Sequence, residues 1–213
     1  MGTINKGILG GFSGKVGTVV GANWRGMDII RSLPKKSSRI PTEEQLSQRL
    51  RFALVAQFLA PLQPVLSAFF GQAQNERSRR NLATSYHLKE AIAGAFPNFV
   101  MDYMKVVVTR GELLGPQDLQ HTPQAGAQIA FTWQDNSGQG SSRNDDGLLL
   151  VVYNEVRNLY EIRQLAANRD ALAYTLNLPD GWSGETVMVW ASMTSADGKK
   201  AANSVYVGAV ALV

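Results

Sequence analysis

The sequence predicts an α+β protein in which a glycine-rich N-terminal β segment and two helices precede a C-terminal antiparallel β-sandwich. Three observations support this fold class. Glycine is interspersed with β-branched residues through the first 32 positions, apolar residues recur at helical spacing between positions 42 and 96, and short apolar runs separated by turn residues fill the last hundred. With 45% hydrophobic residues among 213, the chain can build a core for one or two domains.

The N-terminal segment is unusually rich in glycine. Eight of its first 26 residues are Gly2, Gly7, Gly10, Gly11, Gly14, Gly17, Gly21 and Gly26. We predict strands over residues 15–22 and 27–32, joined by a turn at residues 23–26. Glycine loses more conformational freedom on ordering than any other residue. We therefore expect this segment to pack against its own body or against a neighbouring copy.

A basic linker at residues 33–41 leads to the first predicted helix. Thr42 and Gln45 have the spacing of a capping box, and Pro61 ends the helix or kinks it. Its predicted buried face consists of Leu46, Leu50, Ala53, Leu54, Gln57 and Phe58. Residues 65–70 follow as a further apolar turn.

A second helix is predicted over residues 76–95. Pro97 ends it, and residues 104–109 read as a strand because Val106, Val107 and Val108 are β-branched. The predicted buried face of this helix consists of Leu82, Tyr86, Ile92, Ala95 and Phe96.

Gly115 and Pro116 mark the predicted domain boundary, because composition and charge both change there. This divides the chain into a basic region at 1–114 and an acidic sandwich at 115–213. In the clearest strand, Ile129, Phe131 and Trp133 alternate with smaller or polar residues and so face one side. The other predicted strands are residues 148–154, 171–178, 186–192 and 204–212.

Charge is unevenly distributed along the chain. Residues 1–110 contain 15 Lys or Arg and 6 Asp or Glu, a net charge of +9, whereas residues 111–213 contain 6 and 11, a net charge of −5. Such asymmetry has two functional interpretations: the basic half binds nucleic acid, or the basic end of one copy attracts the acidic end of the next. Two solvated surfaces without partners remain the plainest alternative.

Composition excludes several classes of protein. There is no cysteine, which excludes disulfide frameworks and thiolate metal sites, and only two histidines, His87 and His121, are present. No run reaches the roughly 20 apolar residues that a membrane span needs. Glycine interrupts every apolar run at the N-terminus, so we recognise no signal peptide and expect a cytoplasmic protein or one exported by a non-classical route.

Known binding motifs do not fit. The string around Gly14 and Lys15 lacks the first glycine and the hydroxyl residue of a phosphate-binding loop. A calcium site built from oxygen ligands is an alternative for one loop cluster, although the spacing matches no known calcium loop. That cluster consists of Asp135, Asn136, Asp145 and Asp146. No nucleophile elbow is present, so we expect no enzyme, no cofactor and no bound metal.

Two resemblances follow from these residues. Trp133, Tyr153, the strand at 186–192, the turn at 196–199 and the closing strand at 204–210 resemble a fibronectin type III or immunoglobulin-like domain. This covers about half of the chain and implies a domain that binds or spaces other proteins; without a cysteine pair, an antibody-type domain is excluded.

The first 60 residues resemble a family of unknown function associated with Bacteroidota. The features that carry this resemblance are the string GFSGKVGTVVG at residues 11–21, Trp24-Arg25-Gly26, Ile30-Arg31, Pro34, Gln48-Arg49 and Arg51-Phe52. It implies a bacterial source and supplies no activity.

These observations favour a non-enzymatic structural protein that self-assembles head-to-tail, as a filament or another homo-oligomer, by adding its N-terminal β arm to a neighbour's sheet edge. A protein- or glycan-binding module and a protein that binds nucleic acid through its basic half are the alternatives. The predicted interface consists of Gly14, Lys15, Val16, Val19, Val20, Trp24, Arg25, Ile30 and Arg31.

Overall fold

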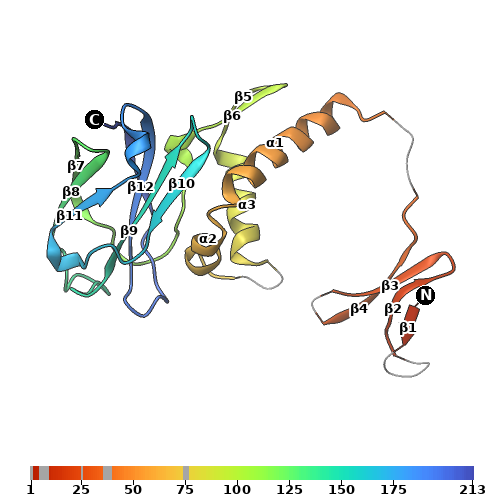
Figure 1. The fold of residues 1–213 in the computed structure, drawn as a ribbon. Coiled ribbons are helices and arrows are strands. Elements are labelled where there is room, and N and C mark those ends of the chain that lie inside the picture. Colours follow the sequence, from red (N-terminus) through yellow and green to blue (C-terminus); the bar gives the residue numbers. More distant parts are fainter. Residues whose placement is uncertain (1, 5–9, 25, 36–39, 74–76) are drawn as a thin grey trace. The chain divides into compact units, whose positions relative to one another are not determined.

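The computed structural model describes residues 2–4, 10–24, 26–35, 40–73 and 77–213. The chain forms two compact units, Met1–Thr42 and Glu43–Val213 (Figure 1). The boundary between the units along the chain lies between Thr42 and Glu43, where the first helix begins, whereas the sequence suggested a boundary at residues 114 and 115. The helices and the sandwich lie within one unit because they share a hydrophobic core.

The N-terminal unit is a four-stranded antiparallel sheet in the order β1-β2-β3-β4. Its strands are β1 (Gly2–Ile4), β2 (Phe12–Val16), β3 (Val19–Trp24) and β4 (Met27–Ser32). The single strand predicted at residues 15–22 is wrong, because Gly17 adopts a φ of +58° and turns the chain between β2 and β3. The predicted turn at 23–26 is also too long, since Trp24 still pairs with Met27 across the β3–β4 hairpin.

Three helices open the second unit: α1 (Glu43–Leu59), α2 (Gln63–Phe69) and α3 (Arg79–Glu90). Of the predicted apolar face of α1, Phe58 lies in the core and Leu54 packs against it. The other four residues that the sequence placed on this face are exposed: Leu46, Leu50, Ala53 and Gln57. The prediction is therefore confirmed only for Leu54 and Phe58.

The chain leaves α3 earlier than the sequence predicts. Residues Ile92–Ala95 (β5) and Asn98–Met101 (β6) form a hairpin instead of a helical end, and Gly94 adopts a φ of +85° within it. A side chain at position 94 would approach the carbonyl oxygen of Asn98 to 2.3 Å, so the hairpin requires glycine there. The predicted strand at 104–109 is also wrong: a short 3-10 helix, η1 (Tyr103–Lys105), begins this stretch and irregular backbone follows.

The sandwich consists of a four-stranded sheet in the order β10-β9-β12-β13 and a three-stranded sheet in the order β11-β8-β7, all antiparallel. Its elements are β7 (Gln117–Gln124), β8 (Gln128–Gln134), β9 (Gly147–Asn154), β10 (Leu159–Arg163), η2 (Arg169–Ala171), β11 (Ala173–Asn177), η3 (Asp180–Trp182), β12 (Thr186–Thr194) and β13 (Val205–Ala211). The sequence analysis located five of these strands and missed β7 and β10. Strand β7 is mostly polar and contains Pro123, which removed the usual strand signal.

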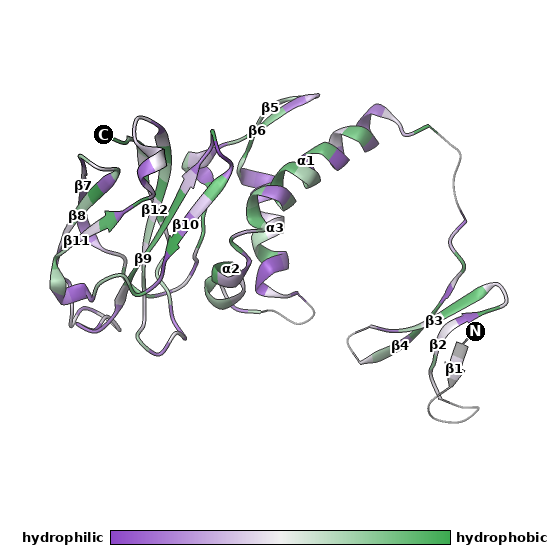
Figure 2. Cartoon of the chain, in the orientation of Figure 1, coloured by the Kyte–Doolittle hydropathy of each residue, from purple (hydrophilic) through white to green (hydrophobic). Residues whose placement is uncertain are grey.

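Strand β9 is buried along its whole length. Leu148, Leu150 and Val152 point into the space between the two sheets, while Leu149 and Val151 point into a second core that the helices complete. The hydrophobic colour along β9 in Figure 2 reflects this burial on both faces. The body therefore has three layers, with helices, the four-stranded sheet and the three-stranded sheet in that order (Figure 1).

Aromatic side chains join the helices to the sandwich. The centroid of the Phe58 ring lies 5.4 Å from that of Tyr153 and 6.2 Å from that of Trp190. Both pairs have the edge-to-face geometry that aromatic rings prefer. The hydroxyl of Tyr160 donates a hydrogen bond of 2.9 Å to the carbonyl oxygen of Phe58. These contacts fix α1 on the outer face of the four-stranded sheet.

The alternation predicted for β8 is confirmed, since Ile129, Phe131 and Trp133 are all buried. Replacing Trp133 by alanine is expected to lower the free energy of unfolding by about 3–5 kcal/mol, because it leaves a large cavity between the sheets. Urea denaturation of the variant measures this loss. Thr132→Ala is the matched control on the same strand: Thr132 is exposed, so its change should stay within about 0.5 kcal/mol. Equal losses in both variants would contradict the assignment of faces.

Candidate interaction surface

One face of the N-terminal sheet carries an apolar stripe with basic residues toward one end. The cross-strand pairs Trp24–Met27, Ala22–Ile29 and Val20–Arg31 share this face, and Lys15 joins it opposite Val20. Trp24 and Met27 are both 45% exposed. The stripe thus exposes the aromatic ring of Trp24 together with the apolar side chains of Met27 and Ile29.

The opposite face is also apolar but glycine-rich. It contains Phe12, Val16, Val19 and Ile30. A side chain at Gly21 would lie 2.2 Å from the carbonyl oxygen of Phe12 and 2.6 Å from its ring, so the ring packs directly over the bare backbone of β3. Only glycine permits this close approach.

The described part of the sheet has no hydrophobic core. Gly21 is the one residue of Met1–Thr42 that the structure describes as buried, while Val16, Ile29 and Ile30 are all exposed. A small sheet needs an apolar face packed on another layer to be stable in water. Its exposed apolar faces therefore make it a candidate interaction surface.

The predicted interface residues are distributed over both faces. Four of them, Lys15, Val20, Trp24 and Arg31, lie on the apolar stripe, whereas the other described ones lie on the glycine-rich face. Those others are Gly14, Val16, Val19 and Ile30. Arg25 lies outside the described residues. The sequence analysis missed Met27 and Ile29, although their pairing with Trp24 and Ala22 follows once the short turn is known.

Helix α1 carries a second exposed apolar surface. Leu46, Leu50 and Phe52 are 40%, 43% and 55% exposed, and Glu43 and Glu44 precede them in the first turn. Phe52 also borders a shallow hollow of ≈ 420 Å³, lined by Gln48, Arg49, Ala53 and Leu88. The first turn of α1 thus carries two acidic side chains next to Leu46 and Leu50, whereas Phe52 lies beside the basic Arg49.

The loop cluster considered as a calcium site instead surrounds a buried guanidinium group. Arg169 is fully buried, lies 3.0 Å from the carboxylate of Asp146 and donates a hydrogen bond to the amide oxygen of Asn136. It also donates to the carbonyl oxygen of Leu114 at 2.9 Å. Asp135 instead caps the backbone N–H of Ser137, and the exposed Asp145 stays outside the cluster. The calcium alternative is therefore wrong, because the arginine occupies the cation position.

The described residues were also compared with the requirements of a metal site and of a membrane-spanning helix. Within them, no group of three His, Asp or Glu side chains could hold a metal ion. No single described helix is long and apolar enough to cross a membrane; α1 and α2 together satisfy the length and composition criteria but are bent by 88°.

His87 is a buried polar residue whose position the sequence did not reveal. Its Nδ1 lies 2.8 Å from the carbonyl oxygen of Ala83, and its Nε2 accepts a hydrogen bond of 3.3 Å from the backbone N–H of Val107. This arrangement fits the neutral ring with its proton on Nδ1. Burial lowers the pKa of His87 below its ordinary value, although the bond to Ala83 partly opposes the shift.

Taken with the topology, these features define an antiparallel β-sandwich with a helical layer and an appended N-terminal sheet. The chain belongs to a family of unknown function, DUF6266, whose model matches residues 11–208. The prediction of a family without known function is thereby confirmed, and the bacterial source stays a prediction. No curated protein matches the chain.

Three solved fibronectin type III domains are similar to about half of this chain. The domain of human collagen alpha-1(XX) has 15% identity and a TM-score of 0.34, over 47% of this chain and 85% of that one. The FN5 domain of Drosophila Lar has 13% identity and a TM-score of 0.31, over 46% and 92%. The domain of human contactin 1 has 6% identity and a TM-score of 0.33, over 49% and 83%.

Neutralising Asp146 should destabilise the protein strongly. Asp146→Asn leaves the buried Arg169 without a counter-charge, and we expect a loss of about 3 kcal/mol in the free energy of unfolding. Asp145→Asn removes the same charge from the exposed neighbouring position and should change stability by less than about 0.5 kcal/mol. Chemical denaturation of the two variants measures the difference, and similar values for both would contradict a structural role for the buried pair.

Acid should weaken the fold through His87. Because the folded-state pKa lies below the unfolded value of 6.5, the unfolded chain binds the proton more readily. Stability is therefore expected to fall as the pH drops from about 6.5 through the lower folded pKa. Urea midpoints between pH 7.5 and 5.5 measure this slope, and His87→Gln should flatten it. The variant's slope is the informative quantity, since its absolute stability also changes; an unaltered slope would exclude His87 as the source.

Proposed function

We propose that this protein is a non-enzymatic structural protein that self-assembles head-to-tail, with the N-terminal sheet of one copy docking on the body of the next. One observation carries the proposal: the described part of the sheet exposes apolar side chains on both faces and buries none of them. Covering the apolar stripe that contains Trp24 removes its side chains from water. Burial of apolar surface is the main driving force of protein association. The distribution of charge along the chain favours a second copy of the same protein as the partner.

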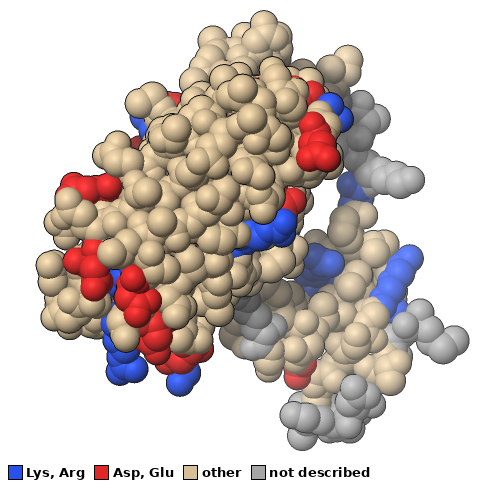
Figure 3. Space-filling view, turned by 60° about the vertical axis from the view of Figure 1, so that its left-hand side comes forward, with Lys and Arg blue, Asp and Glu red and all other residues tan. Residues whose placement is uncertain are grey.

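Charge disfavours pairing between two N-terminal sheets. Residues 1–42 contain seven Lys or Arg and one Asp, a net charge of +6, so two such units repel each other. Residues 43–213 contain 14 Lys or Arg and 16 Asp or Glu, a net charge of −2. Figure 3 shows acidic and basic groups scattered over this face of the body among broad uncharged areas. The sheet is therefore attracted to the body of another copy rather than to another sheet.

The exposed part of α1 is the surface on the body that best complements the stripe. Leu46 and Leu50 lie one helical turn apart and match the apolar side chains around Trp24, while Glu43 and Glu44 offer partners for Lys15 and Arg31. The two surfaces differ, so the contact is heterologous and its repetition forms a ring or a filament.

The first experiment compares single substitutions in the full chain. Trp24→Ala is expected to weaken association by about 2 kcal/mol, roughly 30-fold, with little change in melting temperature, because Trp is the residue type most often found at interface hot spots. Leu50→Lys should weaken association similarly from the opposite surface. Val156→Ala is the control, since Val156 is 77% exposed on a loop of the body. Analytical ultracentrifugation across a concentration series measures association.

A deletion and a salt series also test the proposed self-assembly. Deleting residues 1–33 should leave a folded monomer with an unchanged melting temperature, since Glu43–Val213 is a separate compact unit. Raising the salt concentration should weaken assembly, because exposed charges are screened beyond about 8 Å at physiological ionic strength. A full chain that stays monomeric at all concentrations would overturn the proposal, as would assembly that survives the deletion.

A further inference from the structure

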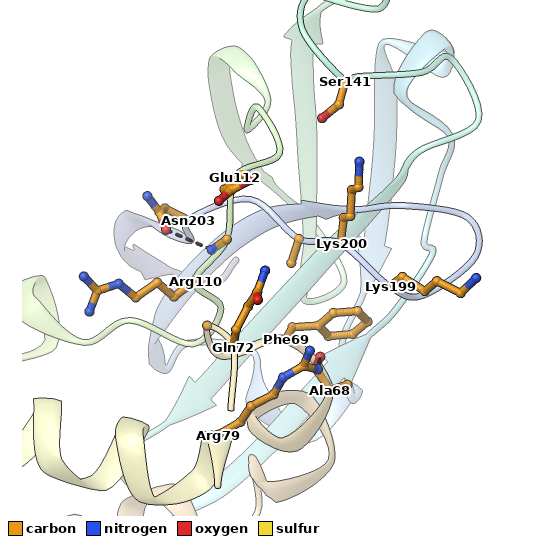
Figure 4. A pocket seen from close by; sticks show the side chains of 13 residues that line it. Ala68, Phe69, Gln72, Arg79, Arg110, Glu112, Ser141, Lys199, Lys200 and Asn203 are labelled. Atoms are coloured by element: carbon orange, nitrogen blue, oxygen red, sulfur yellow. Dashed lines mark hydrogen bonds between the residues drawn. The ribbon is translucent and has the colours of Figure 1, made fainter. Parts of the chain in front are cut away.

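A basic pocket lies where the helical layer meets the sandwich. Its volume is ≈ 530 Å³, and its lining comes from the end of α2, the start of α3, the segment at 110–112 and the hairpin after β12 (Figure 4). Four cationic side chains surround it, from Arg79, Arg110, Lys199 and Lys200, against the single carboxylate of Glu112. Residues distant in sequence thus place four cationic side chains around one hollow, with Arg110 and Lys199 extending toward opposite sides of it and Lys200 extending toward Ser141 (Figure 4).

The backbone that carries Arg110 is held on two sides. Its N–H donates to the carbonyl oxygen of Phe69 at 2.9 Å, and its own carbonyl oxygen accepts from Gly71 at 2.7 Å. The next residue, Gly111, donates to the side-chain oxygen of Asn203 at 3.1 Å. A side chain on Gly111 would lie 2.1 Å from the carbonyl oxygen of Ala201, so the two segments approach as closely as backbone allows. The pocket floor is therefore preorganised.

The positive charge of the pocket is largely uncompensated. Among the described residues, neither Arg110 nor Lys200 forms an ion pair, and Arg79 donates to the backbone oxygen of Ala68. Lys199 lies 3.8 Å from Asp197, and both side chains are largely exposed. Such a contact is weak and leaves Lys199 available for a ligand.

We infer that this pocket binds a ligand that carries a phosphoryl group. An arginine guanidinium matches the oxygens of phosphate through paired hydrogen bonds, and a lysine adds a mobile point charge. Gln72, Ser141 and Asn203 also line the hollow, where they supply neutral hydrogen-bonding groups. A dianionic phosphoryl group is attracted by Arg110 and Lys200 together more strongly than a single carboxylate is.

The pocket has room for more than one phosphoryl group. A second hollow of ≈ 470 Å³ shares Ser141 and Lys200 with it, but Asp145, Asp146 and Asp197 line that hollow. These carboxylates repel anions, so the phosphoryl groups are expected in the first hollow. The ligand is therefore either a small molecule with linked phosphates or a stretch of phosphodiester chain. These two sources present the same chemistry to Arg110 and Lys200, and separate titrations distinguish them.

Titration calorimetry with the full-length protein tests the inference, using inorganic pyrophosphate, inorganic phosphate and a short single-stranded oligonucleotide at low salt. Pyrophosphate should bind saturably, and Arg110→Gln and Lys200→Gln should each weaken it about fivefold. Lys105→Gln is the charge-matched control, because Lys105 is exposed and outside the pocket, and it should leave binding unchanged. Glu112→Gln should tighten binding by at least about twofold, since it removes the opposing carboxylate.

The titrations with pyrophosphate and with the oligonucleotide distinguish a small phosphorylated molecule from a phosphodiester chain. Oligonucleotide binding that exceeds pyrophosphate binding and is weakened by the same two substitutions would identify a phosphodiester ligand; the reverse order would identify a small phosphorylated molecule. Absence of saturable binding to all three probes would overturn the inference. An equal loss in the Lys105→Gln control would also overturn it, because binding would then reflect only the overall charge of the protein.

Discussion

The burial of the β9–β12 ladder on both faces is the constraint on which the rest of the body depends. Side chains of β9 alternate between two cores, one shared with the second sheet and the other shared with the helices. Neither core can form without this ladder, and the ladder has no face left for water. Its hydrophobic sequence is therefore compatible with folding only when the sheet and the helices cover it together.

This shared ladder explains why the helical layer and the sandwich form one unit. Phe58 sits among Tyr153, Tyr160 and Trp190, so its removal would expose both the helix and the sheet. Farther along, Arg169 binds Leu114 and Asn136, and thereby fastens the connecting segment to the loop after β8. The basic pocket lies along the same junction, where rigid backbone on both sides positions flexible cationic side chains.

Local pattern was enough to predict the fold class and the central strands, because Ile129, Phe131 and Trp133 alternate and residues 148–154 are continuously apolar. Features set by distant contacts were not predictable. Arg169 meets partners 23 and 33 residues earlier in the chain, and no local spacing signals such a network. The exposure of Leu50 was missed for a related reason: helical periodicity identifies an apolar face but not what covers it.

In the proposed assembly, the lack of buried apolar side chains in the described part of the N-terminal sheet would make the order of this sheet depend on protein concentration. When a partner binds only the folded form of a segment, the free energy of unfolding of that segment rises with the logarithm of the partner's concentration. Dilute chains would then hold β1–β4 weakly, whereas crowded chains would hold them firmly. In the proposed assembly, a glycine-rich sheet that orders in this way would act as a concentration sensor, and the amount of protein present would set when neighbouring copies engage.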